Sequence, residues 1–110
     1  KSEKDGTLME AKKPDVYYAV FFETFYDSFQ DALSKAPDVI AAHRARSNEF
    51  HAQGTLLMAG AFLNNPGEAL GTMGILTTRE AAEEYVKGDP FVLGGMVSKW
   101  YIREWANMFA

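Results

Sequence analysis

The alternation of apolar and polar residues along the chain predicts four strands. Residues 16–23 (VYYAVFFE) are mostly β-branched or aromatic on both alternating faces, which is typical of a strand that is covered on both sides. Residues 55–63 and 69–77 form two further apolar runs, and the turn residues 64–67 (NNPG) between them predict a β-hairpin. The last strand is predicted over 96–105, where aromatic and β-branched residues again occupy both faces.

Two amphipathic helices are predicted between these strands. Residues 36–53 start with Pro and Asp in the first turn and stop before Gly54, which suits a left-handed helix end. Residues 78–87 form the second predicted helix, with Thr78 as its N-cap. The stretch 24–35 has apolar residues at near-helical spacing, and it fits either a short amphipathic helix or a packed loop.

The predicted order is strand, helix, strand, strand, helix, strand. This is the split βαβ, or ferredoxin-like, α+β pattern, in which a four-stranded antiparallel sheet has both helices on one face. The other face of the sheet would expose Tyr, Phe, Leu and Trp, a large apolar surface for a monomer, so we expect a homodimer. Residues 1–15 are polar without a sustained period and are predicted to be a flexible N-terminal arm, with residues 16–110 as a single domain.

Composition and charge exclude several classes of protein and site. The chain has 110 residues and a formal net charge of −4, which argues against nucleic acid and anionic membranes as partners. No apolar run approaches the ~20 residues of a membrane span. The absence of cysteine excludes disulfides, thiol nucleophiles and thiolate metal sites. No signal peptide is recognisable, but the chain starts at Lys1, so both a cytoplasmic protein and an exported mature form fit.

His43 is the titratable residue on the apolar stripe of the predicted helix 36–53. The other members of the stripe recur at three- and four-residue spacing: Val39, Ile40, Ser47 and Phe50. Two interpretations of His43 stay open, a buried imidazole bonded to a backbone carbonyl and a general base or acid in a pocket. His51 follows more than two turns later and is interpreted as a solvated residue at the helix edge. The two histidines make a poor metal pair, because ligands on one helix prefer i, i+4 spacing, and no metal site is predicted.

Asp89 opens a second segment of interest, in the sequence Asp-Pro-Phe at 89–91. One interpretation is an N-cap for the short apolar element 90–95, since Asp is among the best N-cap residues and Pro suits a first helical turn. The other is a carboxylate aimed at His43 that fixes the tautomer of the imidazole. Sequence spacing leaves both interpretations open.

These segments resemble the YCII-related (YciI-like) family. The resemblance rests on the run from His43 to Gly60, with a histidine on the first helix, a glycine that ends it and a strand that closes in Ala-Gly. It also rests on the run from Asp89 to Gly95, an acidic Asp-Pro-aromatic turn after the second helix. The resemblance covers nearly all of 16–105.

The resemblance implies a dimeric α+β barrel of ferredoxin-like protomers with a site built on His43 and Asp89. Some relatives resemble lyases that eliminate from small hydroxylated aromatic rings, and the wider superfamily includes isomerases and cofactor-free oxygenases. The leading hypothesis is therefore a small cofactor-free enzyme for proton transfer, an elimination or isomerisation on a phenolic or enolisable small molecule. His43 is the expected general base or acid, and Asp89 is expected to orient it.

Four aromatic residues are predicted to form the apolar walls that bind the substrate: Tyr18, Phe62, Tyr85 and Phe91. The alternative hypothesis is a non-catalytic module of the same fold that binds a small molecule or a partner, with His43 and Asp89 as a structural pair. Burial separates the two: a pair that lines an open cavity favours the enzyme, and a sealed pair favours a structural role.

Overall fold

The computed structural model describes residues 13–64 and 68–110. Most of the predicted arm, residues 1–12, and most of the predicted turn, residues 65–67, lie outside the described residues.

The described residues form four strands and four helices, and the predicted order of the main elements is confirmed. The elements are β1 (Val16–Thr24), α1 (Phe29–Lys35), α2 (Pro37–Ala52), β2 (Leu56–Ala61), β3 (Gly71–Leu76), α3 (Arg79–Gly88), α4 (Pro90–Leu93) and β4 (Val97–Ala106). The stretch that fitted either a helix or a loop contains the helix α1. None of the helices within the described ranges is both long and apolar enough to cross a membrane.

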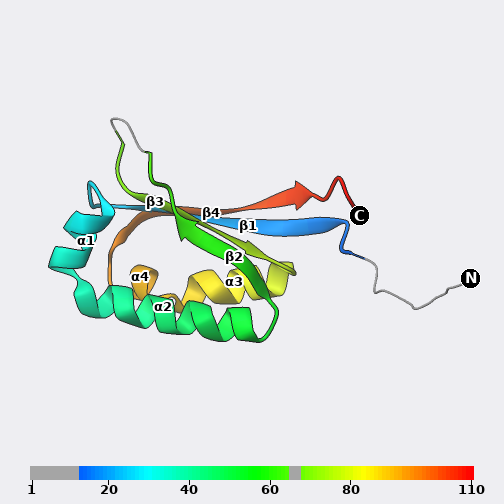
Figure 1. The fold of residues 1–110 in the computed structure, drawn as a ribbon, viewed down its shortest axis with the longest axis horizontal. Helices are drawn as coiled ribbons and strands as arrows, with labels where there is room; N and C mark the ends of the chain where they lie inside the picture. The colour runs from blue at the N-terminus through cyan, green and yellow to red at the C-terminus, as the bar shows by residue number, and fades with distance from the viewer. Residues whose placement is uncertain (1–12, 65–67) are drawn as a thin grey trace, which may run out of the picture.

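The four strands form one antiparallel sheet in the order β2-β3-β1-β4. Helices α2, α3 and α4 lie together on one face of this sheet, and α1 lies at its end (Figure 1). This arrangement confirms the predicted α+β, ferredoxin-like fold class. It also brings α2 close to the junction of α3 and α4, although these segments lie far apart in the sequence.

The core between sheet and helices explains why the α3–α4 junction is fixed. Val20 and Phe22 of the central strand β1 point toward the helices and are almost fully buried. The ring of Phe22 stacks on Tyr85 of α3 at 6.2 Å and meets the edge of Phe91 of α4 at 6.4 Å between ring centroids. Each fully buried side chain of this size contributes about 1.5–3 kcal/mol. The residues on both sides of the junction are therefore anchored to the sheet.

Local sequence explains the ends of the helices. The Ser28 hydroxyl accepts a hydrogen bond from the Asp31 N–H at 3.1 Å and caps α1, which is why a helix rather than a loop forms there. Thr78 caps α3 in the same way through the Ala81 N–H, as predicted. Gly54, at φ +82°, follows the end of α2, where a left-handed residue lets the chain turn into β2.

Candidate active site

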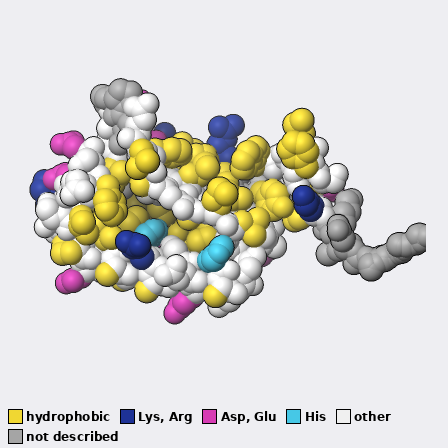
Figure 2. All heavy atoms as spheres, in the orientation of Figure 1, with side chains coloured by type: hydrophobic (Ala, Val, Ile, Leu, Met, Phe, Trp, Pro, Cys, Tyr) yellow, Lys and Arg dark blue, Asp and Glu magenta, His cyan; other side chains and the backbone are white. Residues whose placement is uncertain are grey.

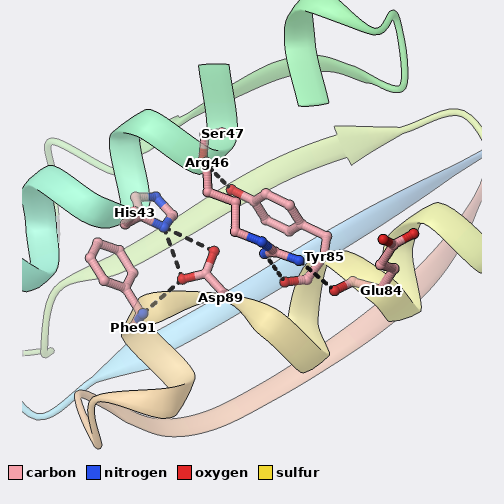
Figure 3. Close-up of polar contacts among 7 residues, drawn as sticks. All are labelled: His43, Arg46, Ser47, Glu84, Tyr85, Asp89 and Phe91. Atoms are coloured by element: carbon pink, nitrogen blue, oxygen red, sulfur yellow. Dashed lines mark hydrogen bonds and ion pairs between the residues drawn. The ribbon is translucent and has the colours of Figure 1, made fainter. Parts of the chain in front are cut away.

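His43 of α2 and Asp89 of the α3–α4 junction form a direct pair (Figure 3). The imidazole Nδ1 lies 2.9 Å from each of the two carboxylate oxygens of Asp89. The Asp89 side chain is 0% exposed and the His43 side chain is 15% exposed. The pair is therefore sealed on the carboxylate side and partly open on the histidine side.

The carboxylate of Asp89 also has a second hydrogen-bond donor. Its Oδ1 accepts the backbone N–H of Phe91 at 2.8 Å, which makes Asp89 the N-cap of α4, with Pro90 as the first helical residue. Asp89 therefore makes both of the contacts that the sequence left open, the cap of α4 and the pair with His43. Because the cap fixes the carboxylate, Asp89 meets His43 in one orientation before any ligand binds.

This geometry sets the tautomer of His43. An ionised carboxylate only accepts hydrogen bonds, so Nδ1 carries the ring hydrogen and, in the neutral imidazole, Nε2 carries the lone pair. The ring of Phe91 stacks on the imidazole with centroids 3.7 Å apart and an interplanar angle of 10°, which holds its plane. Nε2 has no hydrogen-bond partner within residues 13–64 and 68–110. It is thus available to a ligand as a proton acceptor.

A cavity of about 580 Å³ lies beside this pair, between α2 and the edge of the sheet at β2. Figure 2 shows both histidine side chains on the hollowed face, among hydrophobic side chains. The wall on the β2 side is apolar and includes Leu57, Met58 and Ala61, and Tyr85 and Phe91 also line the cavity. The cavity therefore has room for a small ring molecule next to His43.

The polar wall of the cavity comes from α2. His43, Ser47 and His51 line it at four-residue spacing, and Arg44 and Asn48 form a second row one position along. His51 is exposed at the end of α2, as predicted, and it also lines the cavity. Its Nδ1–H donates to the Leu56 carbonyl at 2.7 Å. In the sequence, the four-residue spacing of His43, Ser47 and His51 indicates that they share one face of the helix. That face can be recognised as a cavity wall only when the position of β2 is known.

Tyr85 places a hydroxyl group at the same cavity. Its OH lies 2.7 Å from the Oγ of Ser47. Burial raises the pKa of Tyr85 to about 12, and the nearby Asp89 charge acts in the same direction, whereas the Ser47 hydrogen bond and Arg46 lower it. The phenol therefore stays protonated at neutral pH. Whichever of the two hydroxyls donates to the other, one hydrogen remains for a ligand oxygen.

The raised pKa of Tyr85 predicts how stability changes at high pH. The folded-state pKa lies above the ordinary value of 10.0, so the unfolded chain loses its proton first. Stability should therefore fall as the pH rises above 10. Between pH 9 and pH 11 the wild type should lose about 1 kcal/mol more than Tyr85→Phe in the free energy of unfolding. Urea unfolding at both pH values measures this difference, and equal losses in the two proteins would contradict it.

Arg46 fixes the end of α3 from which Asp89 follows. Its guanidinium donates to the carbonyls of Tyr85 at 2.8 Å and Glu84 at 2.9 Å (Figure 3). It also lies 4.7 Å from the ring centroid of Phe50. Arg46 is half-buried against α3. Its long side chain therefore links α2 to the second half of α3 through two backbone carbonyls.

The structure brings two of the four predicted substrate-binding aromatics to the cavity. Tyr85 and Phe91 line it. Tyr18 does not line it and lies instead under the guanidinium of Arg79, at 5.2 Å. Phe62 follows the end of β2 and lines a separate surface hollow with Gly71. Within the described ranges, no cluster of three or more His, Asp or Glu residues is arranged to hold a metal ion.

The fold is similar to that of a known enzyme. The solved structure of 5-chloro-2-hydroxyhydroquinone dehydrochlorinase (TftG) from Burkholderia phenoliruptrix AC1100, in complex with 2,5-dihydroxybenzoquinone, matches with a TM-score of 0.60 and 17% sequence identity. The match covers 83% of this chain and 94% of that chain, and it shows a shared fold. No curated protein matches the sequence. The family model of the YCII-related domain matches residues 19–106, so the chain belongs to the YCII-related family.

Proposed function

We propose that the protein is a small cofactor-free enzyme that transfers a proton in an elimination or isomerisation of a phenolic or enolisable small molecule. One observation carries this proposal: a buried carboxylate orients His43, and the other ring nitrogen of His43 has no protein partner beside a mostly apolar cavity. A histidine held in this way is suited to act as a general base near neutral pH.

The proposed reaction starts with proton transfer to His43. Nε2 accepts a proton from a C–H or O–H bond of the ligand, and Asp89 stabilises the resulting imidazolium through Nδ1. In an elimination, the electron pair of the broken bond moves through the ring and expels a leaving group with its own electron pair. In an isomerisation, His43 returns the proton to a different carbon. Neither route requires an oxidant or reductant, so atoms and electrons balance within the ligand and the protein.

The walls of the cavity support a planar ring as the ligand. The apolar side from β2 buries ring carbons, and the Ser47–Tyr85 pair offers a hydrogen to an oxygen substituent that gains negative charge during proton transfer. The structural neighbour is, by its name, a dehydrochlorinase for a chlorinated hydroxyhydroquinone. That name agrees with the elimination route and with a hydroxylated aromatic substrate class.

Two assays test the proposal. In D₂O, proton transfer at carbon replaces ring C–H by C–D, so NMR should show faster loss of the ring signals of 1,2,4-trihydroxybenzene, kept free of oxygen, when the protein is added. Elimination should release chloride from 5-chloro-2-hydroxyhydroquinone. Both rates should depend on His43. If neither rate exceeds that of a buffer control, the enzymatic proposal is contradicted.

The alternative function is a small-molecule-binding or interaction module without catalysis. The observation in its favour is that Asp89 is fully buried and caps α4, which gives the carboxylate a structural role in any case. A ligand that binds in the cavity and protects its ring protons from exchange, instead of exchanging them faster, would support this alternative.

We propose that the protein is a homodimer and that the sheet face opposite the helices forms the interface. Phe21, Met73 and Tyr101 lie side by side there, and Phe21 and Tyr101 stack at 4.9 Å between ring centroids. Trp105, opposite Tyr17 on the same face, is 55% exposed. Aromatic side chains at this density are typical of a surface that another chain covers.

We therefore expect sedimentation equilibrium to show a dimer at micromolar concentration. Trp105→Glu places a charge on the proposed interface and should shift the protein to monomer. The matched control is Trp100→Glu, because Trp100 pairs with Phe22 and so lies on the helix side of β4 with a similar exposure of 49%. A wild type that sediments as a monomer would contradict the proposed dimer.

A further inference from the structure

The residues that line the cavity differ in charge from the protein as a whole. The chain carries 15 acidic and 11 Lys or Arg residues, so its surface is acidic on average. The described residues that line the cavity nevertheless include no Asp or Glu, and they include one Lys or Arg, which is Arg44. The carboxylate of Asp89 lies behind His43, fully buried and paired with the imidazole, and does not line the cavity. A cavity with a basic rim in an acidic protein favours a ligand with negative charge.

Arg44 is also available to a ligand. Its side chain is exposed, and within residues 13–64 and 68–110 it forms no salt bridge and no hydrogen bond. Arg46, two residues further along α2, is by contrast engaged, because it donates to two carbonyls of α3. Figure 2 shows a basic side chain at the mouth of the hollow that contains the histidines. The guanidinium of Arg44 therefore has its donors free at the rim.

The position of Arg44 relative to His43 orients such a ligand. Arg44 and Asn48 form one row of α2, and His43 and Ser47 form the neighbouring row. The Arg44–Asn48 row is exposed, whereas His43 and Ser47 are half-buried. A ring that reaches Nε2 of His43 would thus have its inner edge at the His43 row and its outer edge at the Arg44 row. Both outer residues present N–H donors, which match a carboxylate or phenolate oxygen.

We propose that the ligand of this cavity is a planar ring that carries an anionic oxygen group, a carboxylate or a phenolate, bound at the rim by Arg44 and Asn48. This inference rests on the proposed function for the position of the ring beside His43. Beyond that function, it specifies that the substrate is negatively charged and that Arg44 selects for this charge. Arg44 is a specificity-determining residue in this account, and the proton transfer itself belongs to His43.

The test is equilibrium binding of two probes that differ in charge at one group. 4-Hydroxybenzoate and 4-hydroxybenzamide have nearly the same shape, and titration followed by protein NMR gives a Kd for each without any turnover. The wild type should bind the benzoate about tenfold more tightly than the benzamide, the difference expected for hydrogen bonds to a charged group. The preference should shrink as NaCl is raised from 20 to 500 mM, because the pair lies at an exposed rim.

Three variants identify the residue responsible. Arg44→Gln should reduce the preference to within about twofold and leave the Kd of the benzamide unchanged, whereas Arg44→Lys should keep most of the preference because it keeps the charge. Lys87→Gln removes the same charge from the exposed last turn of α3, away from the cavity lining, and should keep the full preference.

Equal binding of the two probes by the wild type, or an unchanged preference in Arg44→Gln, would overturn this inference, as would a failure of both probes to bind at 10 mM. These outcomes concern affinity alone. The proposed function fails separately, through the exchange and chloride assays and their dependence on His43.

Discussion

Replacing His43 with glutamine is expected to slow deuterium exchange and chloride release by about 10²–10⁴-fold, the usual contribution of a general acid–base residue. Glutamine keeps an N–H for the Asp89 carboxylate, but its amide has no lone-pair nitrogen that can take a proton. Since the His43 side chain is partly open to the cavity, the fold should be retained, and circular dichroism and a melting curve check this.

The matched control for this substitution is His51→Gln. His51 lies on the same helix and along the same cavity, but its Nδ1–H donates to a backbone carbonyl rather than to a carboxylate. We expect it to lose only a few-fold in rate. A His43→Gln variant that reacts as fast as His51→Gln would remove His43 from the catalytic role.

Removing the carboxylate of Asp89 is expected to have the largest effect on stability. Asp89→Ala removes the cap of α4 and leaves the buried Phe91 N–H and the Nδ1–H of His43 without their acceptor. A lost N-cap costs about 1 kcal/mol and a lost hydrogen bond to a charged group about 1.5–3 kcal/mol. The expected total is about 2–4 kcal/mol, or a fall in Tm of about 10 °C or more for a domain of this size.

Two further variants make this result specific. Asp38→Ala removes an exposed carboxylate from the first turn of α2, where no side-chain cap is formed, and should change the free energy of unfolding by less than about 0.5 kcal/mol. Asp89→Asn keeps an oxygen for the Phe91 N–H and should recover part of the stability, because Asn caps nearly as well as Asp. A melting temperature of Asp89→Ala equal to that of Asp38→Ala would show that the pair contributes little to the fold.

The order of the elements could be predicted from the sequence because each strand is densely apolar on both faces and each long helix has a clear end signal. The stretch 24–35 could not be assigned, since its apolar spacing fits both a helix and a loop. The hydrogen bond by which Ser28 caps the helix is visible only in the structure. The contacts of Arg46 were not predictable either, because helical periodicity does not show which carbonyls of the neighbouring helix α3 lie within reach of its guanidinium.

The sequence was enough to predict the pair at the centre of the site, but not which residues line the cavity around it. His43 and Asp89 stand 46 positions apart, so their contact depends on how α2 packs on the α3–α4 junction. Alternation along a strand shows which face Tyr18 takes, but it does not show how far along the sheet the cavity reaches. Phe62 lies just beyond β2, where alternation no longer applies. Arg44 was missed because its row lines a cavity only once β2 lies beside α2.

The most direct test of the account is a crystal structure of the protein with 1,2,4-trihydroxybenzene, grown without oxygen. In the proposed mechanism the ligand reacts at Nε2 of His43 while Asp89 holds Nδ1. We predict that the ring lies between α2 and β2, with one of its oxygens or ring carbons within about 3.2 Å of Nε2. A ring bound elsewhere on the protein, or a protein side chain that occupies Nε2 in the complex, would contradict the account.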